Sequence, residues 1–276
     1  MEGKIFKAEN LISQDILKHI KKKFGRVVNI SKSDIALSND VFFVDTVNQK
    51  LVLKIFKAKN KFLFNINNHE VLINYFAAKN ITPFCLFFNH KYAVFEYIEG
   101  IPLQADNLHT DFPNIIKEIH NAELNINKRN FFKTAGIYCK KISPQYLKNE
   151  LLQEALRQSF NLLETINKFK PEIALCHNDL NPNNFIQSQN KLYILDFEYA
   201  SINDKYFDFA SIKTLLNKNN FANFIQKYDI ILNDAKLHAY GCLINFISSL
   251  WCFMMGYYEM GEQSAMQMLK KIKDLS

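Results

Sequence analysis

Four polar side chains in the stretch 177–196 have the types and spacing that phosphoryl transfer requires. His177, Asp179 and Asn184 follow the pattern H-x-D-x-x-x-x-N, and an apolar run ends directly at Asp196. This reaction depends on positioning and charge compensation, so it needs a carboxylate beside the attacking hydroxyl and oxygen ligands for Mg²⁺. Asp179 can be that carboxylate and accept the hydroxyl proton, with Asn184 and Asp196 as the metal ligands. We expect His177 to support the loop through hydrogen bonds rather than to act as the base.

The chain around these residues predicts how they meet. The strand-like segments 184–186 and 192–195 can pair as a hairpin across a polar turn. Such a hairpin returns the chain and places Asp196 beside Asn184, while Asp179 begins the tight loop before it. Polar turn residues around an ordinary hairpin are the alternative, which does not account for the whole ordered set.

The stretch 175–210 resembles the catalytic segment of the kinase-like small-molecule phosphotransferases, the family of aminoglycoside phosphotransferases and choline/ethanolamine kinases. The continuation from Asp196, which reads D-F-E-Y-A, then Asn203 and F-D-F-A, is more similar to the choline kinase branch, including the bacterial ones. The resemblance covers nearly the whole chain, with specific motifs only in this stretch. It implies an α+β, bilobal protein-kinase-like fold, with ATP and Mg²⁺ as cofactors and a small-molecule alcohol as acceptor. The N-lobe, an antiparallel sheet plus a helix that binds the nucleotide, would comprise residues 1–97. A mainly helical C-lobe with the catalytic loop and the acceptor site would comprise residues 98–276.

The elements expected before the catalytic loop match the smaller lobe of such a fold. Periodicity and turn residues favour, in chain order, a helix, three strands, a helix and two strands, at residues 10–24, 27–30, 41–44, 51–56, 61–79, 84–88 and 92–97. Lys54 lies in the third strand between apolar neighbours, and a lysine buried there needs a partner. We predict an ion pair between Lys54 and Glu70 of the following helix; an edge-strand lysine and a surface glutamate are the alternative. The resemblance implies that Lys54 contacts the nucleotide phosphates.

The predicted nucleotide loop departs from the family pattern at one position. The turn 36–40 stands where the family has a G-x-[ST]-N-like loop, and the glycine of that pattern is absent. Ser38 and Asn39 match the pattern, and the resemblance implies that they bind the nucleotide. It also implies that the backbone groups of Glu96 and Ile98 form hydrogen bonds with the adenine.

Helical patterns dominate the chain after the Gly-Ile-Pro at 100–102, which is the expected hinge between the lobes. We expect helices at 111–124, from Ser143-Pro144 onwards, and at 212–228, 234–258 and 261–273, and we expect residues 173–176 to lead into the catalytic loop. His120, on the first of these helices, is expected to be a buried structural residue.

The acceptor site is predicted from the resemblance to the choline kinase branch. That branch holds a quaternary ammonium by cation–π contact and nearby carboxylates, because such a cation cannot donate hydrogen bonds. Glu198, Tyr199 and Trp251, the only tryptophan, match this arrangement. Other choline kinases often carry a second tryptophan where this chain has Ser248 and a glutamate where it has Leu215. We therefore predict a small amino alcohol, choline ahead of ethanolamine. An aminoglycoside-type or other alcohol acceptor is one alternative. A nucleotide-binding pseudo-kinase is another. For Trp251 itself, a position in the hydrophobic core is equally compatible with its apolar neighbours.

Composition and charge limit the remaining classes of function. The 276 residues are 48% hydrophobic, enough for a full core, and the formal net charge is +7. The lysines are scattered among asparagines, and the run at 21–23 is expected to be a solvated face, so no nucleic-acid partner is predicted. Residues 239–258 contain no charge but are interrupted by glycine, serine and asparagine. This pattern favours a buried helix, and no membrane partner is predicted.

The cysteines and the first residues of the chain indicate the cellular compartment of the protein. The five cysteines form no C-x-x-C pair and are odd in number, which indicates reduced thiols in a cytoplasmic protein. The first residues lack the apolar run of a signal peptide. The sequence does not specify an oligomeric state.

Overall fold

The computed structural model describes residues 10–57, 66–106, 109–189 and 191–275, and the chain forms two compact units. The first unit is Met1–Leu103 with Pro182–Tyr199, and the second is Gln104–Asn181 with Ala200–Ser276. The first unit thus ends at Leu103 rather than at residue 97, and it takes in the hairpin after the catalytic loop.

Within the described residues, the first unit contains an antiparallel sheet of five strands in the order β1-β2-β3-β5-β4. The strands are β1 (Val27–Lys32), β2 (Asp40–Thr46), β3 (Lys50–Ile55), β4 (Cys85–Phe88) and β5 (Tyr92–Glu96). The predicted strand order along the chain is therefore confirmed, with bounds that shift by one or two residues.

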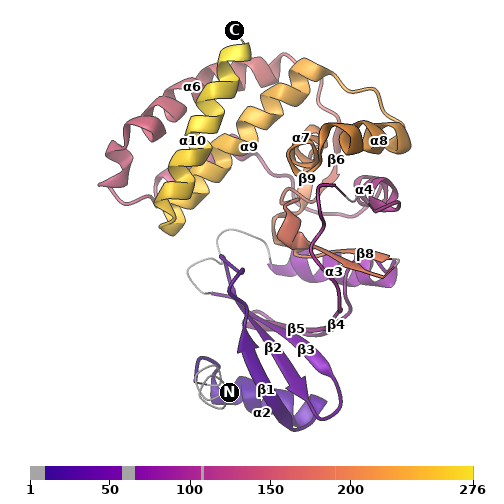
Figure 1. Ribbon diagram of the computed structural model, residues 1–276. Helices are drawn as coiled ribbons and strands as arrows, with labels where there is room; N and C mark the ends of the chain where they lie inside the picture. Colours follow the sequence, from indigo (N-terminus) through magenta and orange to yellow (C-terminus); the bar gives the residue numbers. More distant parts are fainter. Residues whose placement is uncertain (1–9, 58–65, 107–108, 190, 276) are drawn as a thin grey trace. The chain divides into compact units, whose positions relative to one another are not determined.

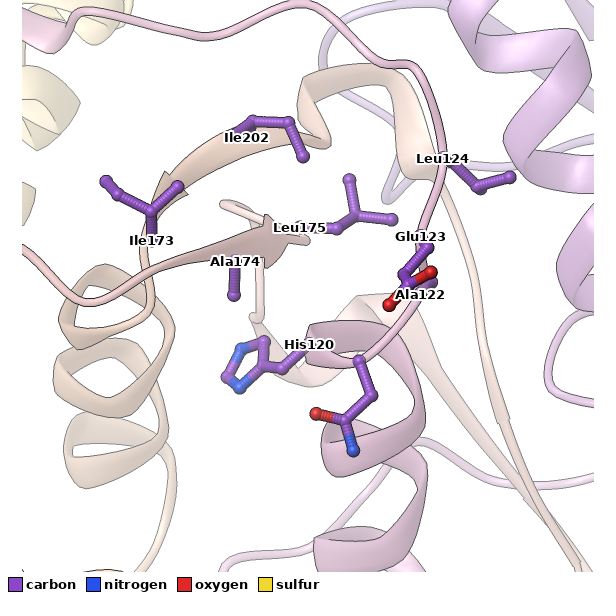
Figure 2. Close-up of a pocket in the computed structure, with 9 residues that line it drawn as sticks. His120, Ala122, Glu123, Leu124, Ile173, Ala174, Leu175 and Ile202 are labelled. Carbon is purple, nitrogen blue, oxygen red and sulfur yellow. The ribbon is translucent and has the colours of Figure 1, made fainter.

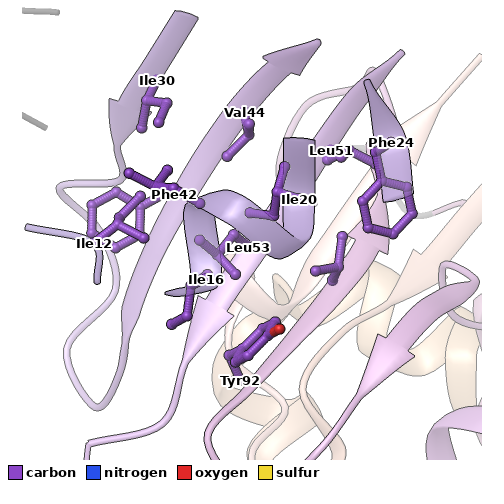
Figure 3. Packing of buried hydrophobic residues seen from close by; sticks show 12 residues of the cluster. Ile12, Ile16, Ile20, Phe24, Ile30, Phe42, Val44, Leu51, Leu53 and Tyr92 are labelled. Carbon is purple, nitrogen blue, oxygen red and sulfur yellow. The ribbon is translucent and has the colours of Figure 1, made fainter. Parts of the chain in front are cut away.

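One face of this sheet is covered by helix α2 (Gln14–Phe24), whose apolar side chains point onto the strands (Figure 3). Ile20 of α2, Phe42 of β2 and Leu53 of β3 are fully buried in this cluster. Because successive side chains of a strand point to opposite faces, Leu53 and Lys54 lie on opposite sides of β3. Packing against α2 therefore directs Lys54 to the other face of the sheet.

The hairpin that follows the catalytic loop packs within the same unit. It consists of β7 (Phe185–Ser188) and β8 (Lys191–Ile194), preceded by the 3-10 turn η3 (Pro182–Asn184) and followed by η4 (Phe197–Tyr199). Helix α3 (Ile66–Ala78) contacts η4, where Phe76 stacks on Phe197 with ring centroids 4.7 Å apart. The part of the predicted helix before Ile66 lies outside the described residues.

Backbone hydrogen bonds explain why the hairpin belongs to the first unit. The N–H of Ile194 donates to the carbonyl of Ile81, and Ile101 and Gln187 exchange hydrogen bonds of 3.0 and 2.8 Å. The chain approaches so closely there that a Cβ on Gly100 would lie 2.5 Å from the carbonyl oxygen of Gln187. Glycine is therefore required in the predicted hinge.

The second unit is mainly helical (Figure 1). Its helices are α4 (Phe112–His120), α5 (Phe131–Cys139), α6 (Glu150–Asn167), α7 (Tyr206–Leu215), α8 (Lys218–Tyr228), α9 (Asp234–Met255) and α10 (Tyr258–Ile272), with the short strands β6 (Ile173–Cys176) and β9 (Ser201–Asp204) paired antiparallel. Helix α9 packs against α5, α6, α7 and α10. Among the described residues it is the one helix long and apolar enough to span a membrane, and 61% of its most apolar segment is buried inside the structure. This burial supports the prediction of a core helix.

Two local predictions in this unit are wrong, and two of its elements were missed. Ser143 does not begin a long helix: a 3-10 turn, η2 (Tyr146–Lys148), follows it, and α6 is capped by Asn149, whose side chain accepts from the N–H of Leu152. The helix expected at 212–228 is divided in two because the side chain of Asn217 caps a new helix. Helix α5 and strand β9 were not predicted.

Candidate active site

The loop that carries Asp179 is anchored by one buried carboxylate in the second unit. Asp208 of α7 is fully buried and accepts hydrogen bonds of 2.8 Å from the backbone N–H groups of both His177 and Asn178. Nε2 of His120 lies 3.1 Å from the same carboxylate, and Nδ1 of His120 lies 2.9 Å from the Tyr228 hydroxyl. The prediction that His120 is a buried structural residue is confirmed.

Asn178 allows the loop to turn sharply after β6. Its φ is +63°, a left-handed conformation that asparagine tolerates. Its side chain donates to the hydroxyl of Ser201 at 2.8 Å and accepts from Asn203 at 3.2 Å. The turn is thereby fixed to β9 on its far side.

Asp179 is half-buried and held by its own loop. The side chain of Asn181 donates to Oδ1 of Asp179 at 3.1 Å, and the N–H of Asp179 lies 3.3 Å from Nδ1 of His177. His177 is fully buried. Its position agrees with support of the loop rather than proton transfer, and Asn181 is a contact that the sequence interpretation missed.

The anchoring by Asp208 leads to a stability prediction. Asp208→Asn replaces one accepting oxygen by a donor that faces other donors, which leaves buried groups unsatisfied. We expect the free energy of unfolding to fall by about 3 kcal/mol, and kcat to fall because the loop loses its anchor. Urea denaturation measures the first effect. Asp111→Asn, at an aspartate whose side chain is 58% exposed, is the control for loss of a charge, and equal stability of the two variants would contradict the anchoring role.

Lys54 lies at the centre of an ion cluster in the first unit. Its ammonium is 2.8 Å from Oδ2 of Asp196 and 2.6 Å from Oε1 of Glu198, and Lys54 is 8% exposed. Burial alone would lower the pKa of Lys54, but the two adjacent carboxylates outweigh it and raise the pKa above its ordinary value. Lys54 is therefore held in its charged form.

The predicted ion pair between Lys54 and Glu70 is wrong. Glu70 lies on the exposed side of α3, while its neighbour His69 is buried, 2% exposed, and faces inward. The packing of Phe76 on Phe197 fixes the rotation of α3 and brings η4 beside β3, so Glu198 reaches Lys54 instead. A ligand atom of His69 lies within 4.8 Å of ligand atoms of Asp196 and Glu198.

Asn39 belongs to this cluster through its side chain. It is 1% exposed, donates to Oε1 of Glu198 at 2.7 Å and accepts from the N–H of Lys57 at 3.2 Å. Asn39 thus connects the turn between β1 and β2 to η4, and its amide is engaged by the protein itself. Ser38, which precedes it, is half-buried.

Glu198 has a different environment from that expected of an acceptor-binding carboxylate. It is 4% exposed, and burial followed by the charge of Asp196 raises its pKa to about 7, although Lys54 acts in the opposite direction. Its contacts with Lys54 and Asn39 assign it to the lysine cluster. We revise its predicted role from contact with the acceptor cation to support of Lys54.

Asn184 and Asp196 lie at the same end of the β7–β8 hairpin. The N–H of Leu195 donates to the carbonyl of Asn184 at 2.8 Å, which extends the strand pairing to the residue before Asp196. Asp196 has a φ of +63°, so its backbone leaves the strand abruptly. The donors here are a carboxylate and an amide oxygen with the carboxylate of Glu198 close by, a set that fits a hard, oxygen-preferring cation such as Mg²⁺.

The predicted adenine contacts lie at the end of β5. The N–H of Glu96 donates to the carbonyl of Phe84 at 3.0 Å, and its side chain accepts from the N–H of Phe84 at 2.8 Å. The backbone N–H of Glu96 is thus engaged by the protein itself. Ile98 lies in the irregular segment that follows and is half-buried.

Trp251 has an aromatic neighbour that the sequence interpretation missed. Its ring stacks on Tyr257 with centroids 5.9 Å apart and an angle of 22° between the planes, and both residues are half-buried. Tyr257 follows Gly256, whose φ of +91° ends α9 and turns the chain back. Ser248 lies one turn before Trp251 and is also half-buried. Tyr199, the remaining predicted acceptor residue, is half-buried at the end of η4 in the other unit.

The second unit also contains a hollow of about 580 Å³. It is formed by the end of α4, the segment after it and the strands β6 and β9, with His120, Glu123 and Leu175 among its lining (Figure 2). Among the described residues that line it, none is a predicted site residue. We assign no role in the reaction to this hollow.

The comparisons with known proteins agree with this geometry. The model of the family described as choline/ethanolamine kinase matches residues 30–213. A curated relative, the protein LicA homolog of Mycoplasma capricolum subsp. capricolum, is 28% identical over 206 residues, which are 71% of this chain and 83% of that protein.

Solved structures show the same fold. Choline kinase LicA from Streptococcus pneumoniae has a TM-score of 0.83 at 22% identity, covering 95% of this chain and 98% of that one. A structure of LicA in complex with AMP has a TM-score of 0.78 at 23% identity, covering 95% and 97%. Because the family match spans more than half of its length, this chain belongs to the choline/ethanolamine kinase family. It is thus a phosphotransferase with an α+β, kinase-like fold, as predicted.

Proposed function

We propose that this protein is an ATP- and Mg²⁺-dependent kinase that transfers the γ-phosphoryl group to the hydroxyl of a small amino alcohol, choline most of all. The observation that carries the proposal is the cluster in which Lys54 pairs with Asp196 at the end of the hairpin. A buried, permanently charged lysine beside a carboxylate is what binding of a nucleotide and its metal requires. Membership of the choline/ethanolamine kinase family supports the small alcohol as acceptor.

In this proposal Asp179 accepts the proton of the substrate hydroxyl. The hydrogen bond that Asn181 donates to Oδ1 holds the carboxylate in one orientation. Asp208 keeps the loop in place through the two backbone N–H groups. These contacts fix the base before the substrate arrives, and the entropy of ordering it does not add to the barrier.

Lys54 contacts the phosphates, and Asn184 and Asp196 hold the metal ion. Mg²⁺, when bound, compensates phosphate charge during transfer. Glu198 and Asn39 keep the Lys54 ammonium on the correct side of β3. Ser38 and the backbone groups of Glu96 and Ile98 complete the nucleotide site in this proposal, and the AMP complex of a LicA structure supports nucleotide binding in this fold.

The acceptor would bind at Trp251, and Tyr199 stays an acceptor residue that only the family resemblance implies. Trp251 and Tyr257 present two aromatic rings, so Tyr257 can supply the wall that Ser248 lacks. A quaternary ammonium gains cation–π stabilisation from such rings, whereas a protonated primary amine would lose hydrogen bonds to water. This difference favours choline over ethanolamine. The five free cysteines fit the proposal that the protein works in the reducing cytoplasm.

A substrate panel tests this proposal. Turnover with ATP and Mg²⁺ should be highest for choline, lower for ethanolamine, and low for thiamine and an aminoglycoside. Trp251→Ala should raise KM for choline at least tenfold, because about 1.4 kcal/mol of cation–π contact is lost, while KM for ATP stays constant. Phe160→Ala, at an aromatic residue that is 72% exposed on α6, is the control. Choline turnover that does not respond to the loss of Trp251 would remove the cation site and leave an alcohol kinase of another specificity.

The aminoglycoside-type and pseudo-kinase alternatives give distinct outcomes. Turnover of the aminoglycoside alone would indicate the first. ATP binding with no turnover on any alcohol of the panel would indicate a nucleotide-binding pseudo-kinase.

A further inference from the structure

The lysine cluster of the first unit combines an imidazole with two carboxylates. His69 of α3, Asp196 after β8 and Glu198 of η4 each offer one ligand atom, and these atoms all lie within 4.8 Å of one another. We propose that His69, Asp196 and Glu198 bind a borderline-soft divalent ion such as Zn²⁺, which takes the place of the Lys54 ammonium. This site differs from an Mg²⁺ site because it depends on His69.

The position of Lys54 shows that the cluster attracts a cation. Its ammonium lies 2.8 Å from Asp196 and 2.6 Å from Glu198. The single positive charge of the ammonium neutralises one of the two carboxylate charges, and a divalent ion would neutralise both. Since Glu198 is 4% exposed, water screens the remaining negative charge poorly, which favours the doubly charged ion.

The types of ligand atom determine which divalent ions bind at this site. Mg²⁺ prefers an octahedral shell of oxygen atoms and retains several waters, so an imidazole adds nothing to its binding. Zn²⁺ and Co²⁺ accept imidazole and carboxylate together in sites with few ligands. His69 is 2% exposed, and its ring packs edge-on against Phe56 and Phe88 with centroids 6.0 and 5.7 Å away. The imidazole is thus held beside the carboxylates before an ion arrives.

Occupation of this site has a consequence for the reaction. A divalent ion between Asp196 and Glu198 would expel the Lys54 ammonium and engage the carboxylate that the nucleotide-bound metal requires. Zn²⁺ should therefore inhibit phosphoryl transfer rather than support it. This consequence rests on the proposed function, but the binding of the ion does not.

Cobalt is the spectroscopic probe for this site. The nucleotide-free, Mg²⁺-free full-length protein is titrated with Co²⁺, whose visible d–d absorption reports binding, and bound Co²⁺ is then displaced with Zn²⁺. We expect saturable absorption, and we expect His69→Gln to weaken the affinity at least tenfold because it removes the nitrogen ligand.

Two control variants test whether Co²⁺ binds at other residues of the first unit. His19→Gln removes a half-buried histidine that contacts the Tyr92 hydroxyl at 2.6 Å, and it should leave the Co²⁺ affinity unchanged. Cys85→Ser removes the only cysteine of the first unit and should also have no effect. A thiolate-to-cobalt band in the near-ultraviolet, or equal Co²⁺ binding by wild type and His69→Gln, would overturn the proposal. Absence of binding by the wild type would overturn it as well.

Inhibition gives the second measurement. At saturating ATP and Mg²⁺, the Zn²⁺ concentration for half-inhibition should rise at least tenfold in His69→Gln, with each protein normalised to its own rate without Zn²⁺. Equal sensitivity of the two proteins would reject the assignment. If the wild type shows no turnover at all, the proposed function fails, and the cobalt titration still decides the metal site.

Discussion

Replacement of Asp179 by asparagine is expected to lower kcat by roughly 10²–10⁴-fold, the usual contribution of a positioned general base. The substitution keeps the shape of the side chain and the oxygen that accepts from Asn181. It removes the negative charge and the ability to take the hydroxyl proton. Because Lys54 and Asp196 are unchanged, KM for ATP should stay near the wild-type value.

Steady-state kinetics with ATP and choline measure both parameters. A variant that retains more than about a tenth of kcat, roughly 1.4 kcal/mol of barrier, would reject Asp179 as the base. Asp111→Asn makes the same chemical change at an exposed aspartate and controls for net charge. A large rise in KM for ATP with kcat preserved would instead place Asp179 in nucleotide binding.

The elements around the catalytic loop could be predicted because their signals are local. The segment expected to lead into the catalytic loop is strand β6, Ile173–Cys176. The hairpin of β7 and β8 forms near its predicted bounds because polar turn residues separate two short apolar runs. Lys54 could be placed on the third strand because apolar residues flank it on both sides. In each case, neighbours in the sequence determine the structure.

The partner of Lys54 could not be predicted because it depends on packing between distant segments. A helical pattern shows that His69 and Glu70 point in different directions, but it does not show which of them faces β3. The stacking of Phe76 on Phe197 settles that rotation, and the two rings are far apart in the sequence. Glu198 reaches Lys54 for the same reason.

Two side-chain contacts near the predicted sites could not be predicted from the sequence either. The turn at 36–40 lacks the glycine of the family pattern, and Asn39 connects that turn to Glu198 and to the N–H of Lys57. Tyr257 was missed because the left-handed turn at Gly256 brings it back to Trp251. A glycine followed by tyrosine is a common sequence, so no pattern identified this contact.

Replacement of Asp196 should lower activity more than replacement of Asn184, the other predicted metal ligand. Asp196→Ala removes a carboxylate that contacts Lys54 at 2.8 Å and, in the proposed function, holds the metal ion against the phosphates. Lys54 would then be paired with Glu198 alone, and the nucleotide-bound metal would lose its charged ligand. We expect kcat/KM to fall by more than about 10³-fold, since both positioning and charge compensation are lost.

Asn184→Ala is the matched comparison at the same end of the hairpin. Asn184 supplies a neutral oxygen, which a water molecule can replace, so raised Mg²⁺ should restore a large part of its activity. Asp196→Ala should stay inactive across the same range of Mg²⁺ concentration, because water cannot replace the charge. Thermal unfolding of both variants controls for loss of the hairpin. If Mg²⁺ restored Asp196→Ala as fully as Asn184→Ala, Asp196 would not be the principal ligand, and the Lys54 cluster would have a structural role instead.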